Sequence, residues 1–368
     1  MSEIYKNIVA PFLDTQDSET WHNHARNALA LAESNPLTLR LVELFAQGHR
    51  RFTDQRLNIV LGGVEFDNPV MVGAGWTKTG KAVEALYRLG FSGVEVGSVL
   101  DYPQPGNEKP RQFMVGPGVC INALGFNTPG VEAVAQNLER YRESGIPIGI
   151  SLGKNKDIPN VAAPEMHAVI IKRLYDHAAY FVINVSSPNT PGLRALQDKG
   201  PLTDIAQAVN DAMDTIGDRR PLFVKIAPDL TNDAVNDVIR VVVDNGLTGI
   251  IATNTTNNPD IKARYGERWR NQPGGLSGDD IDYRRMSTEK VTHIYKETDG
   301  AVEIIGVGGV KNWQTALEKI RAGAKVVQVV TAIRGEGPRV AGKINRGLVG
   351  YMESEGVKNV RELVGSAH

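Results

Sequence analysis

The chain has 368 residues, of which 41% are hydrophobic, and a formal net charge of -1. This length and apolar content suffice for one large α/β barrel with an extension, and the absence of a basic block argues against a nucleic-acid partner. The single cysteine, Cys120, excludes an intrachain disulfide and favours a reducing compartment. The first residues show no signal peptide and no apolar run reaches the length of a membrane span, so we expect a protein that is soluble or attached to a membrane surface.

Residues 1–56 differ from the rest of the chain and predict a small helical extension. Apolar residues recur at helical spacing over 18–34, and a second helix is predicted over 36–52 with Leu37, Leu41, Leu44 and Phe45 on one face. Our interpretation is a helical cap that packs on the main domain. The alternative is a helix pair that lies in a membrane surface, because basic residues follow the apolar face.

Residues 57–368 repeat one pattern, a short apolar run followed in most cases by a helical segment. Eight such units predict a (β/α)8 barrel, and strands that are apolar throughout are typical of a parallel sheet buried on both faces. A doubly wound open sheet is the alternative. The eight predicted strand segments are 69–75, 93–99, 148–153, 180–187, 222–228, 249–255, 303–309 and 326–332.

Two further segments interrupt this pattern. NIVLGGVEFDNPV, residues 58–70, predicts a hairpin whose turn is Gly62-Gly63. Residues 100–129 are too many for a simple strand-to-helix turn, so we expect a lid or hairpin over the barrel mouth.

The carboxyl ends of barrel strands form the active face of this fold. Here they carry glycines, amides, hydroxyls and two lysines, a set that suits a planar polar ligand. They show neither the spacing of a metal site nor a Ser-His-Asp arrangement. The residues at these ends are Ala74, Gly75, Lys78, Gly97, Ser98, Ser151, Asn184, Ser186, Ser187, Asn189, Lys225, Thr253, Asn254, Thr255, Gly308, Gly309 and Thr331.

Two features at these ends have competing interpretations. GVGG at 306–309 follows the seventh strand, where this fold commonly binds phosphate, although glycines also serve ordinary turns. Lys225 lies within an apolar strand and is either a Schiff-base nucleophile or a fixed cation beside a cofactor that gains negative charge. Lys78 is less determined, and Cys120 is interpreted as a small buried hydrophobe.

Several motifs resemble class 2 dihydroorotate dehydrogenases, the quinone-linked group. The most specific is NVSSPNTPGLRALQ at 184–197; GSVLDYPQPGNEKPR, LGKNK, VKIAPDLT, TNTT and GGLSG follow the same order. The resemblance covers nearly all of 57–350 and is looser in the N-terminal helices. It implies an FMN-containing barrel that oxidises dihydroorotate to orotate in pyrimidine biosynthesis and passes electrons to a quinone. It also implies a peripheral location on the cytoplasmic face of the cell membrane, with the cytosol as the alternative.

The resemblance assigns roles to individual residues. Ser187 would be the base that takes the C5 proton while hydride passes from C6 to FMN, and Thr190 would help to shape the proton relay. The implied substrate contacts are Lys78, Asn122, Phe126, Asn184, Asn189, Asn254 and Thr255. The implied FMN contacts are Ala74, Gly75, Lys78, Ser98, Ser151, Asn184, Lys225, Thr253, Gly278, Gly308, Gly309, Val330 and Thr331.

The chain also departs from the family pattern. Ser151 stands where the family has an asparagine, Val330 where it has a tyrosine and Ala123 where it has an arginine. Met114 replaces a basic residue near the quinone, and Thr77 replaces an acid. These departures spare the implied base and the four implied asparagines, and they bear on the binding of the flavin and of the electron acceptor. The alternatives are a related FMN dehydrogenase with a soluble acceptor or another dihydropyrimidine, a Schiff-base aldolase that uses Lys225, and a barrel that only binds a phosphorylated ligand.

Overall fold

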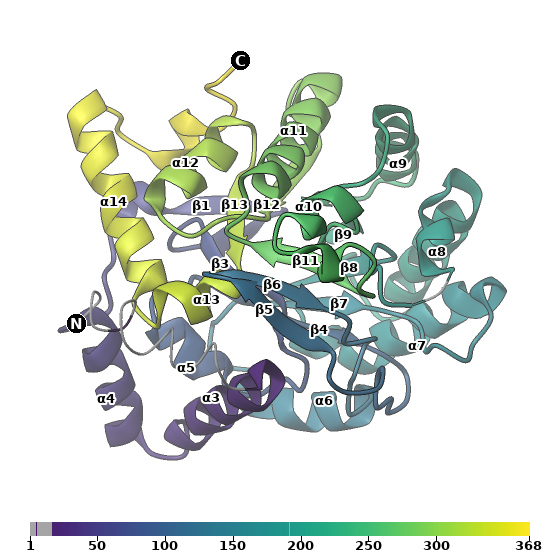
Figure 1. Cartoon of the computed structure of the whole chain (residues 1–368), viewed down its shortest axis with the longest axis horizontal. Coiled ribbons are helices and arrows are strands. Elements are labelled where there is room, and N and C mark those ends of the chain that lie inside the picture. The colour runs from purple at the N-terminus through teal and green to yellow at the C-terminus, as the bar shows by residue number, and fades with distance from the viewer. Residues whose placement is uncertain (1–4, 6–16, 191) are drawn as a thin grey trace.

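The computed structural model describes Tyr5, residues 17–190 and residues 192–368. Most of the first residues, for which no signal peptide was expected, therefore lie outside the described residues. Eight parallel strands close into a barrel (Figure 1), which confirms the predicted barrel and excludes the open sheet. Around the barrel the strands follow the order β10-β12-β13-β3-β4-β7-β8-β9. Their bounds are β3 (Val70–Thr77), β4 (Val94–Val99), β7 (Ile148–Leu152), β8 (Tyr180–Asn184), β9 (Leu222–Ile226), β10 (Gly249–Ala252), β12 (Glu303–Val307) and β13 (Val326–Val329).

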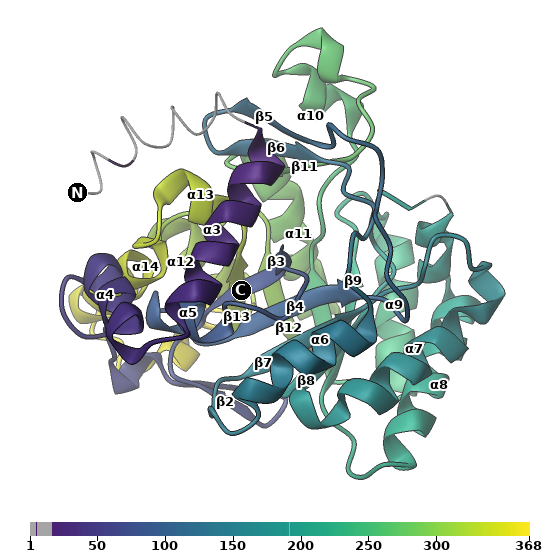
Figure 2. The same cartoon turned by 90° about the horizontal axis from the view of Figure 1, so that it is seen from below.

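The helices surround the barrel (Figures 1 and 2), and most of the longer helices bury mainly apolar side chains against it. In α9 (Asn232–Asp244), Val235, Val238 and Val242 are buried, and the Thr231 side chain caps the helix by accepting a hydrogen bond from the backbone N–H of Ala234. The other helices after β3 are α5 (Val83–Arg88), α6 (Val131–Leu138), α7 (Ala163–Leu174), α8 (Lys199–Asp214), α10 (Pro259–Ala263), α11 (Ile281–Thr298), α12 (Trp313–Arg321), α13 (Thr331–Glu336) and α14 (Val340–Glu355).

Two small antiparallel sheets complete the barrel domain. The hairpin of β1 (Ile59–Leu61) and β2 (Val64–Phe66) turns at Gly62 and Gly63, with φ of 58° and 80°, as predicted. Within the 100–129 segment, β5 (Gln112–Gly116) and β6 (Val119–Asn122) form the expected hairpin, and β11 (Gly275–Gly278) pairs with β6. This three-stranded sheet lies across one end of the barrel (Figure 2).

The N-terminal helices predicted from the sequence are present as α3 (Ser18–Ala32) and α4 (Pro36–Gln47). Two buried carboxylates anchor α3 on the main domain. Glu19 accepts two hydrogen bonds from Arg111, at 2.7 and 2.9 Å, and Glu33 accepts from the Tyr141 hydroxyl at 2.5 Å and the Ala85 backbone N–H at 2.9 Å. Among the described residues, no helix is both long and apolar enough to cross a membrane.

A buried lysine makes the stability of this fold depend on pH. Lys319 of α12 is fully buried and donates to Ser287 Oγ at 2.9 Å and Thr288 Oγ1 at 3.1 Å. Burial lowers the pKa of Lys319 to about 7, from 10.5. At a pH between these two values the Lys319 amine is protonated in the unfolded chain and neutral in the folded chain. The free energy of unfolding therefore increases as the pH rises above 7 and decreases as the pH falls back toward 7.

When the pH is raised from 7 to 9, we therefore expect the free energy of unfolding to increase less for Lys319→Met than for the parent protein. The difference between the two free energies of unfolding should change by about 2 kcal/mol over this interval. Urea denaturation at both pH values measures it, with Lys296→Met, which alters an exposed lysine of the neighbouring helix α11, as the control. An equal change in the Lys319→Met and parent proteins would contradict a neutral buried amine.

Candidate active site

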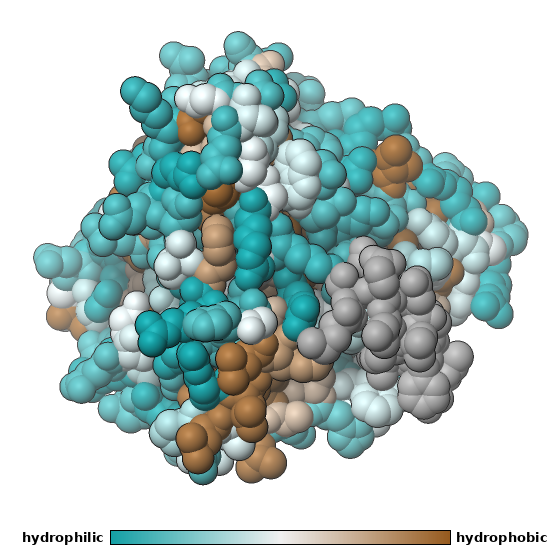
Figure 3. All heavy atoms as spheres, turned by 90° about the vertical axis from the view of Figure 1, so that its left-hand side faces the viewer, coloured by the Kyte–Doolittle hydropathy of each residue, from teal (hydrophilic) through white to brown (hydrophobic). Residues whose placement is uncertain are grey.

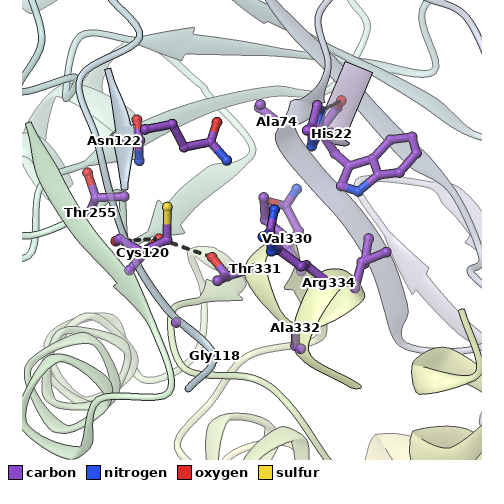
Figure 4. A pocket seen from close by; sticks show the side chains of 18 of the residues that line it. His22, Ala74, Gly118, Cys120, Asn122, Thr255, Val330, Thr331, Ala332 and Arg334 are labelled. Atoms are coloured by element: carbon purple, nitrogen blue, oxygen red, sulfur yellow. Dashed lines mark hydrogen bonds between the residues drawn. The ribbon is translucent and has the colours of Figure 1, made fainter. Parts of the chain in front are cut away.

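A cavity of about 1410 Å³ lies at the carboxyl ends of the barrel strands, bounded by the three-stranded sheet and by α3, α4 and α13. Its volume exceeds that of a pocket for one small ligand and leaves room for two. Eighteen of the nineteen candidate residues line it: Ala74, Gly75, Lys78, Ser98, Asn122, Phe126, Asn184, Ser187, Asn189, Lys225, Thr253, Asn254, Thr255, Gly278, Gly308, Gly309, Val330 and Thr331. Figure 4 shows Asn122 and Thr255 on the wall opposite Ala74 and His22.

The nineteenth candidate, Ser151, is fully buried and lies behind the wall. Its Oγ is 2.9 Å from Ser98 Oγ, and Ser98 accepts a hydrogen bond of 2.7 Å from Asn184 Nδ2. Ser151 therefore does not line the cavity, and its connection to the cavity wall is the hydrogen bond to Ser98.

The two serines that end the β8 segment have different environments. Ser186 is fully buried, donates to Asn184 Oδ1 at 3.0 Å and accepts from Asn254 Nδ2 at 3.0 Å. Ser187 lines the cavity, and its Oγ accepts from the Asn189 backbone N–H at 3.2 Å. Ser186 thus ties two strand ends together, while the Ser187 hydroxyl lies where a ligand can meet it.

The loop that carries Ser187 is held by one arginine. Arg194 donates to the Ser186 carbonyl at 3.2 Å, to the Thr255 carbonyl at 3.3 Å and to Asp229 Oδ2 at 3.0 Å. Asp229 also accepts from the Thr256 hydroxyl at 2.5 Å. The loops after β8, β9 and β10 are therefore joined at the guanidinium group.

We expect Arg194→Gln to loosen this loop and lower the turnover rate about tenfold, because small displacements of a reacting group are costly. Bound cofactor should be unaffected, since Arg194 does not line the cavity. Steady-state kinetics and the absorbance of the purified protein measure the two effects. Arg219→Gln, which removes a half-exposed pair with Asp214, is the matched control and should leave turnover unchanged.

Glycines let the backbone approach a ligand at the far end of the cavity. Gly308 and Gly309 adopt φ of 114° and 73°, and a Cβ on Gly309 would lie 2.6 Å from that of Arg284. Close by, the hydroxyls of Ser277 and Thr331 are 3.0 Å apart (Figure 4). Backbone N–H groups and hydroxyls of this kind suit a phosphate group.

Two lysines give the cavity positive charge. Lys225 lies on the floor and is paired with Glu95 at 3.5 Å. Lys78 donates to the Gly75 carbonyl at 2.9 Å, and burial together with the charge of Arg26 lowers the pKa of Lys78 to about 8. Within the described residues, no group of three or more His, Cys, Asp or Glu side chains is arranged to hold a metal ion.

Sequence reasoning missed several residues of this cavity. His22 of α3 lines it, with Nε2 2.7 Å from the Trp76 carbonyl, and burial lowers the pKa of His22 to about 4, which keeps the ring neutral. Arg334 of α13 and Gln328 of β13 also line it. His22 lies within the predicted apolar face of the first helix, and a polar ring on an apolar face was the feature of the sequence that could have identified it.

The match to known proteins covers nearly the whole chain. The family model for dihydroorotate dehydrogenase matches residues 56–352. The chain belongs to the dihydroorotate dehydrogenase family. It is 38% identical over 362 residues to "Dihydroorotate dehydrogenase (quinone)" of Erythrobacter litoralis, covering 98% of this chain and 99% of that one. A Halobacterium salinarum protein of the same name is 40% identical over 349 residues, 95% of each chain.

A solved structure agrees with this assignment. The crystal structure of DHODH in complex with ferulenol from Eimeria tenella superimposes with a TM-score of 0.86 at 33% identity, covering 96% of each chain. The dihydroorotate dehydrogenase fold is therefore present throughout the main domain and the N-terminal helices.

The residues that depart from the family pattern fit their surroundings. Thr77 is buried and donates to the Lys81 carbonyl at 2.9 Å, which closes the turn after β3. Ala123 is buried and its N–H donates to the Arg111 carbonyl at 2.7 Å. Met114 and Val330 line the cavity and make its wall more apolar.

The cavity residues fit a flavin. Gln328 Oε1, Thr255 Oγ1 and Asn189 Oδ1 are buried and have no hydrogen-bond partner within the described residues, and all three side chains line the cavity. Buried acceptors without a donor are rare in native proteins and indicate a ligand that supplies N–H groups. Gly278 and Gly309 line the cavity with φ of 103° and 73°, a backbone conformation that glycine adopts without strain.

Proposed function

We propose that this chain is a quinone-linked dihydroorotate dehydrogenase that oxidises dihydroorotate to orotate in pyrimidine biosynthesis, with FMN as its cofactor. One observation carries the proposal: a single cavity brings Ser187, the four candidate asparagines and both candidate lysines together at the carboxyl ends of the barrel. The identity of about 40% to enzymes named for this reaction supports it.

Ser187 is the proposed base. FMN, when bound, would supply the acceptor for the hydride that leaves C6 of dihydroorotate. Ser187 Oγ would take the proton from C5, so that the double bond of orotate forms with no other oxidant at this step. A serine hydroxyl is a weak base at its ordinary pKa, so the proton must pass on from Oγ as it arrives. Thr190 and Phe126, both largely buried, are the proposed wall of that relay.

The amides hold the substrate. Asn189 Nδ2 donates to Asn122 Oδ1 at 3.2 Å, which leaves Asn189 Oδ1 as an acceptor for a ring N–H. Asn254 accepts from the Thr255 backbone N–H at 2.8 Å, and the unpartnered Thr255 hydroxyl lines the cavity. Alternating donors and acceptors of this kind match the carbonyls, N–H groups and carboxylate of a planar pyrimidine.

The part of the cavity nearest the N-terminal helices suits the quinone. Trp21, Ala25, Leu29, Leu41 and Phe45 line it from α3 and α4. This wall is apolar, as an isoprenoid or aromatic acceptor requires, and neutral His22 adds a polar contact.

Comparison of electron acceptors tests this assignment. Purified protein supplied with dihydroorotate should reduce a soluble quinone at least about a hundredfold faster than fumarate or NAD. Equal turnover with fumarate or NAD would overturn the quinone assignment and favour a family member with a soluble acceptor.

An exposed apolar patch is the proposed membrane contact. Leu31, Leu37, Leu41, Leu44 and Phe45 are exposed on α3 and α4, and Figure 3 shows apolar side chains gathered on this face. Contiguous exposed apolar surface indicates an interaction site, and its position beside the mouth of an apolar cavity favours a lipid surface, from which the quinone would enter. The chain would then lie peripherally on the cytoplasmic face of the membrane.

We expect the double variant Leu31→Ser, Leu37→Ser to bind vesicles of phosphatidylcholine and phosphatidylglycerol about tenfold more weakly, because two exposed leucines no longer enter the bilayer. Neither residue lines the cavity, so turnover with a soluble quinone should be unchanged. Val161→Ser, Val243→Ser, which alters exposed residues outside this patch, is the control in the same cosedimentation assay. Equal binding of the leucine variant and the parent would contradict the membrane contact.

A further inference from the structure

The barrel interior beneath the cavity contains a cluster of four polar side chains, which we call the floor cluster: Glu95 of β4, Tyr180 of β8, Lys225 of β9 and Gln328 of β13. Glu95 Oε1 is 3.5 Å from Lys225 Nζ, and Glu95 Oε2 accepts from the Tyr180 hydroxyl at 3.2 Å and from Gln328 Nε2 at 2.5 Å. Each of these four residues is at most 5% exposed. Barrel interiors are normally filled by bulky apolar side chains, so this cluster needs an explanation.

The four side chains of the floor cluster lie at two depths below the cavity. Lys225 and Gln328 line the cavity, whereas Glu95 and Tyr180 lie below them. Within the described residues, Glu95 is the sole carboxylate in an ion pair with Lys225, and Lys225 Nζ makes no hydrogen bond other than the one to Glu95. The carboxylate therefore holds the ammonium group from below and leaves its remaining N–H groups for a ligand above.

The charges of the pair give this arrangement a chemical meaning. A buried ammonium group without a counter-ion is strongly disfavoured, and a buried pair is retained when both members have good partners. An oxidised isoalloxazine ring is neutral and cannot serve as the counter-ion, whereas the reduced ring can carry a negative charge. In the resting protein Glu95 is the counter-ion of Lys225, and the hydrogen bonds from Tyr180 and Gln328 stabilise the carboxylate of Glu95.

We propose that Glu95 is a positioning residue that serves as the resting counter-ion of Lys225 and thereby sets the relative affinity of the protein for reduced and oxidised FMN. This inference rests on the proposed FMN-dependent function. With Glu95 present, the floor is neutral and its positive end faces the flavin. Without Glu95, the ammonium group loses its ion-pair partner, so the negatively charged reduced flavin is favoured over the neutral oxidised flavin.

The test is a double-mutant cycle on the ratio of the dissociation constants of oxidised and reduced FMN. Glu95→Gln should shift this ratio at least tenfold toward reduced FMN, which is a rise of about 30 mV in the midpoint potential of a two-electron couple. Lys225→Met should shift it at least tenfold the other way. The ratio for the double variant should lie between those of the parent and of Lys225→Met. The double variant has neither an unpaired charge in the floor cluster nor the oriented pair of Glu95 and Lys225.

A matched control separates local charge from general damage. Glu303, at the start of β12, forms an ion pair of 2.7 Å with Lys325 and does not line the cavity, so Glu303→Gln should leave the ratio unchanged. Should Glu95→Gln fail to fold, Glu95→Asp keeps the charge but draws it back from Lys225, and a smaller rise is expected.

The outcomes distinguish this inference from the proposed function. A ratio that is unchanged or lower in Glu95→Gln, or unchanged in Glu95→Asp, would overturn the role of Glu95 while the parent still binds FMN and is reduced by dihydroorotate. A parent protein that binds no FMN would overturn the proposed function, and the role of Glu95 with it.

Discussion

Ser187→Ala is expected to leave FMN bound and to slow the reduction of FMN by dihydroorotate by about 10²- to 10⁴-fold, the contribution of a positioned acid–base group. The hydroxyl lines the cavity and makes one hydrogen bond to the backbone of its own loop, so its loss removes a proton acceptor and little of the fold. Anaerobic stopped-flow absorbance measures the reduction step separately from reoxidation by the quinone.

Two comparisons make this result specific to proton removal. Ser187→Cys retains a group that can accept the proton and should reduce FMN faster than Ser187→Ala. The dissociation constant of orotate should change much less than the rate. Reduction of Ser187→Ala at the parent rate would show that another group is the base.

Gly309→Ala is expected to weaken FMN binding at least about a hundredfold. Gly309 has φ of 73°, where a side chain is strained, and a Cβ there would lie 2.6 Å from Cβ of Arg284, so the loop that faces the phosphate must move. Titration of the apoprotein with FMN, followed by flavin fluorescence, gives the dissociation constant.

Gly356→Ala is the matched control for Gly309→Ala. Gly356 ends α14 at φ of 69° with no atom within 4 Å of an added Cβ, so it carries the same backbone strain without the collision. Its FMN affinity should equal that of the parent. An unchanged affinity in Gly309→Ala would show that the phosphate does not bind at this loop.

Local pattern was sufficient for most of the fold. Each barrel strand lies at a short apolar run, because a parallel strand buried on both faces carries apolar side chains on both. Most of these runs end in glycine, a hydroxyl or an amide. The hairpin at Gly62-Gly63 was also predictable from a short stretch of sequence, since turn residues act on their immediate neighbours.

The site was predictable where its residues end strands and not where partners come from distant strands. An acid at position 95 within an apolar run was a visible anomaly, but its partners Tyr180, Lys225 and Gln328 are 85, 130 and 233 residues away. Ser151 shows what strand-end position alone cannot predict: it is fully buried, and its hydroxyl is hydrogen-bonded to that of Ser98, which lines the cavity.

The measurement that tests the central claim most directly is an anaerobic absorbance titration of the purified protein with dihydroorotate. We predict a flavin spectrum that is bleached in proportion to added dihydroorotate and restored by a quinone. A protein without flavin absorbance, or a flavin that dihydroorotate fails to bleach, would contradict the account.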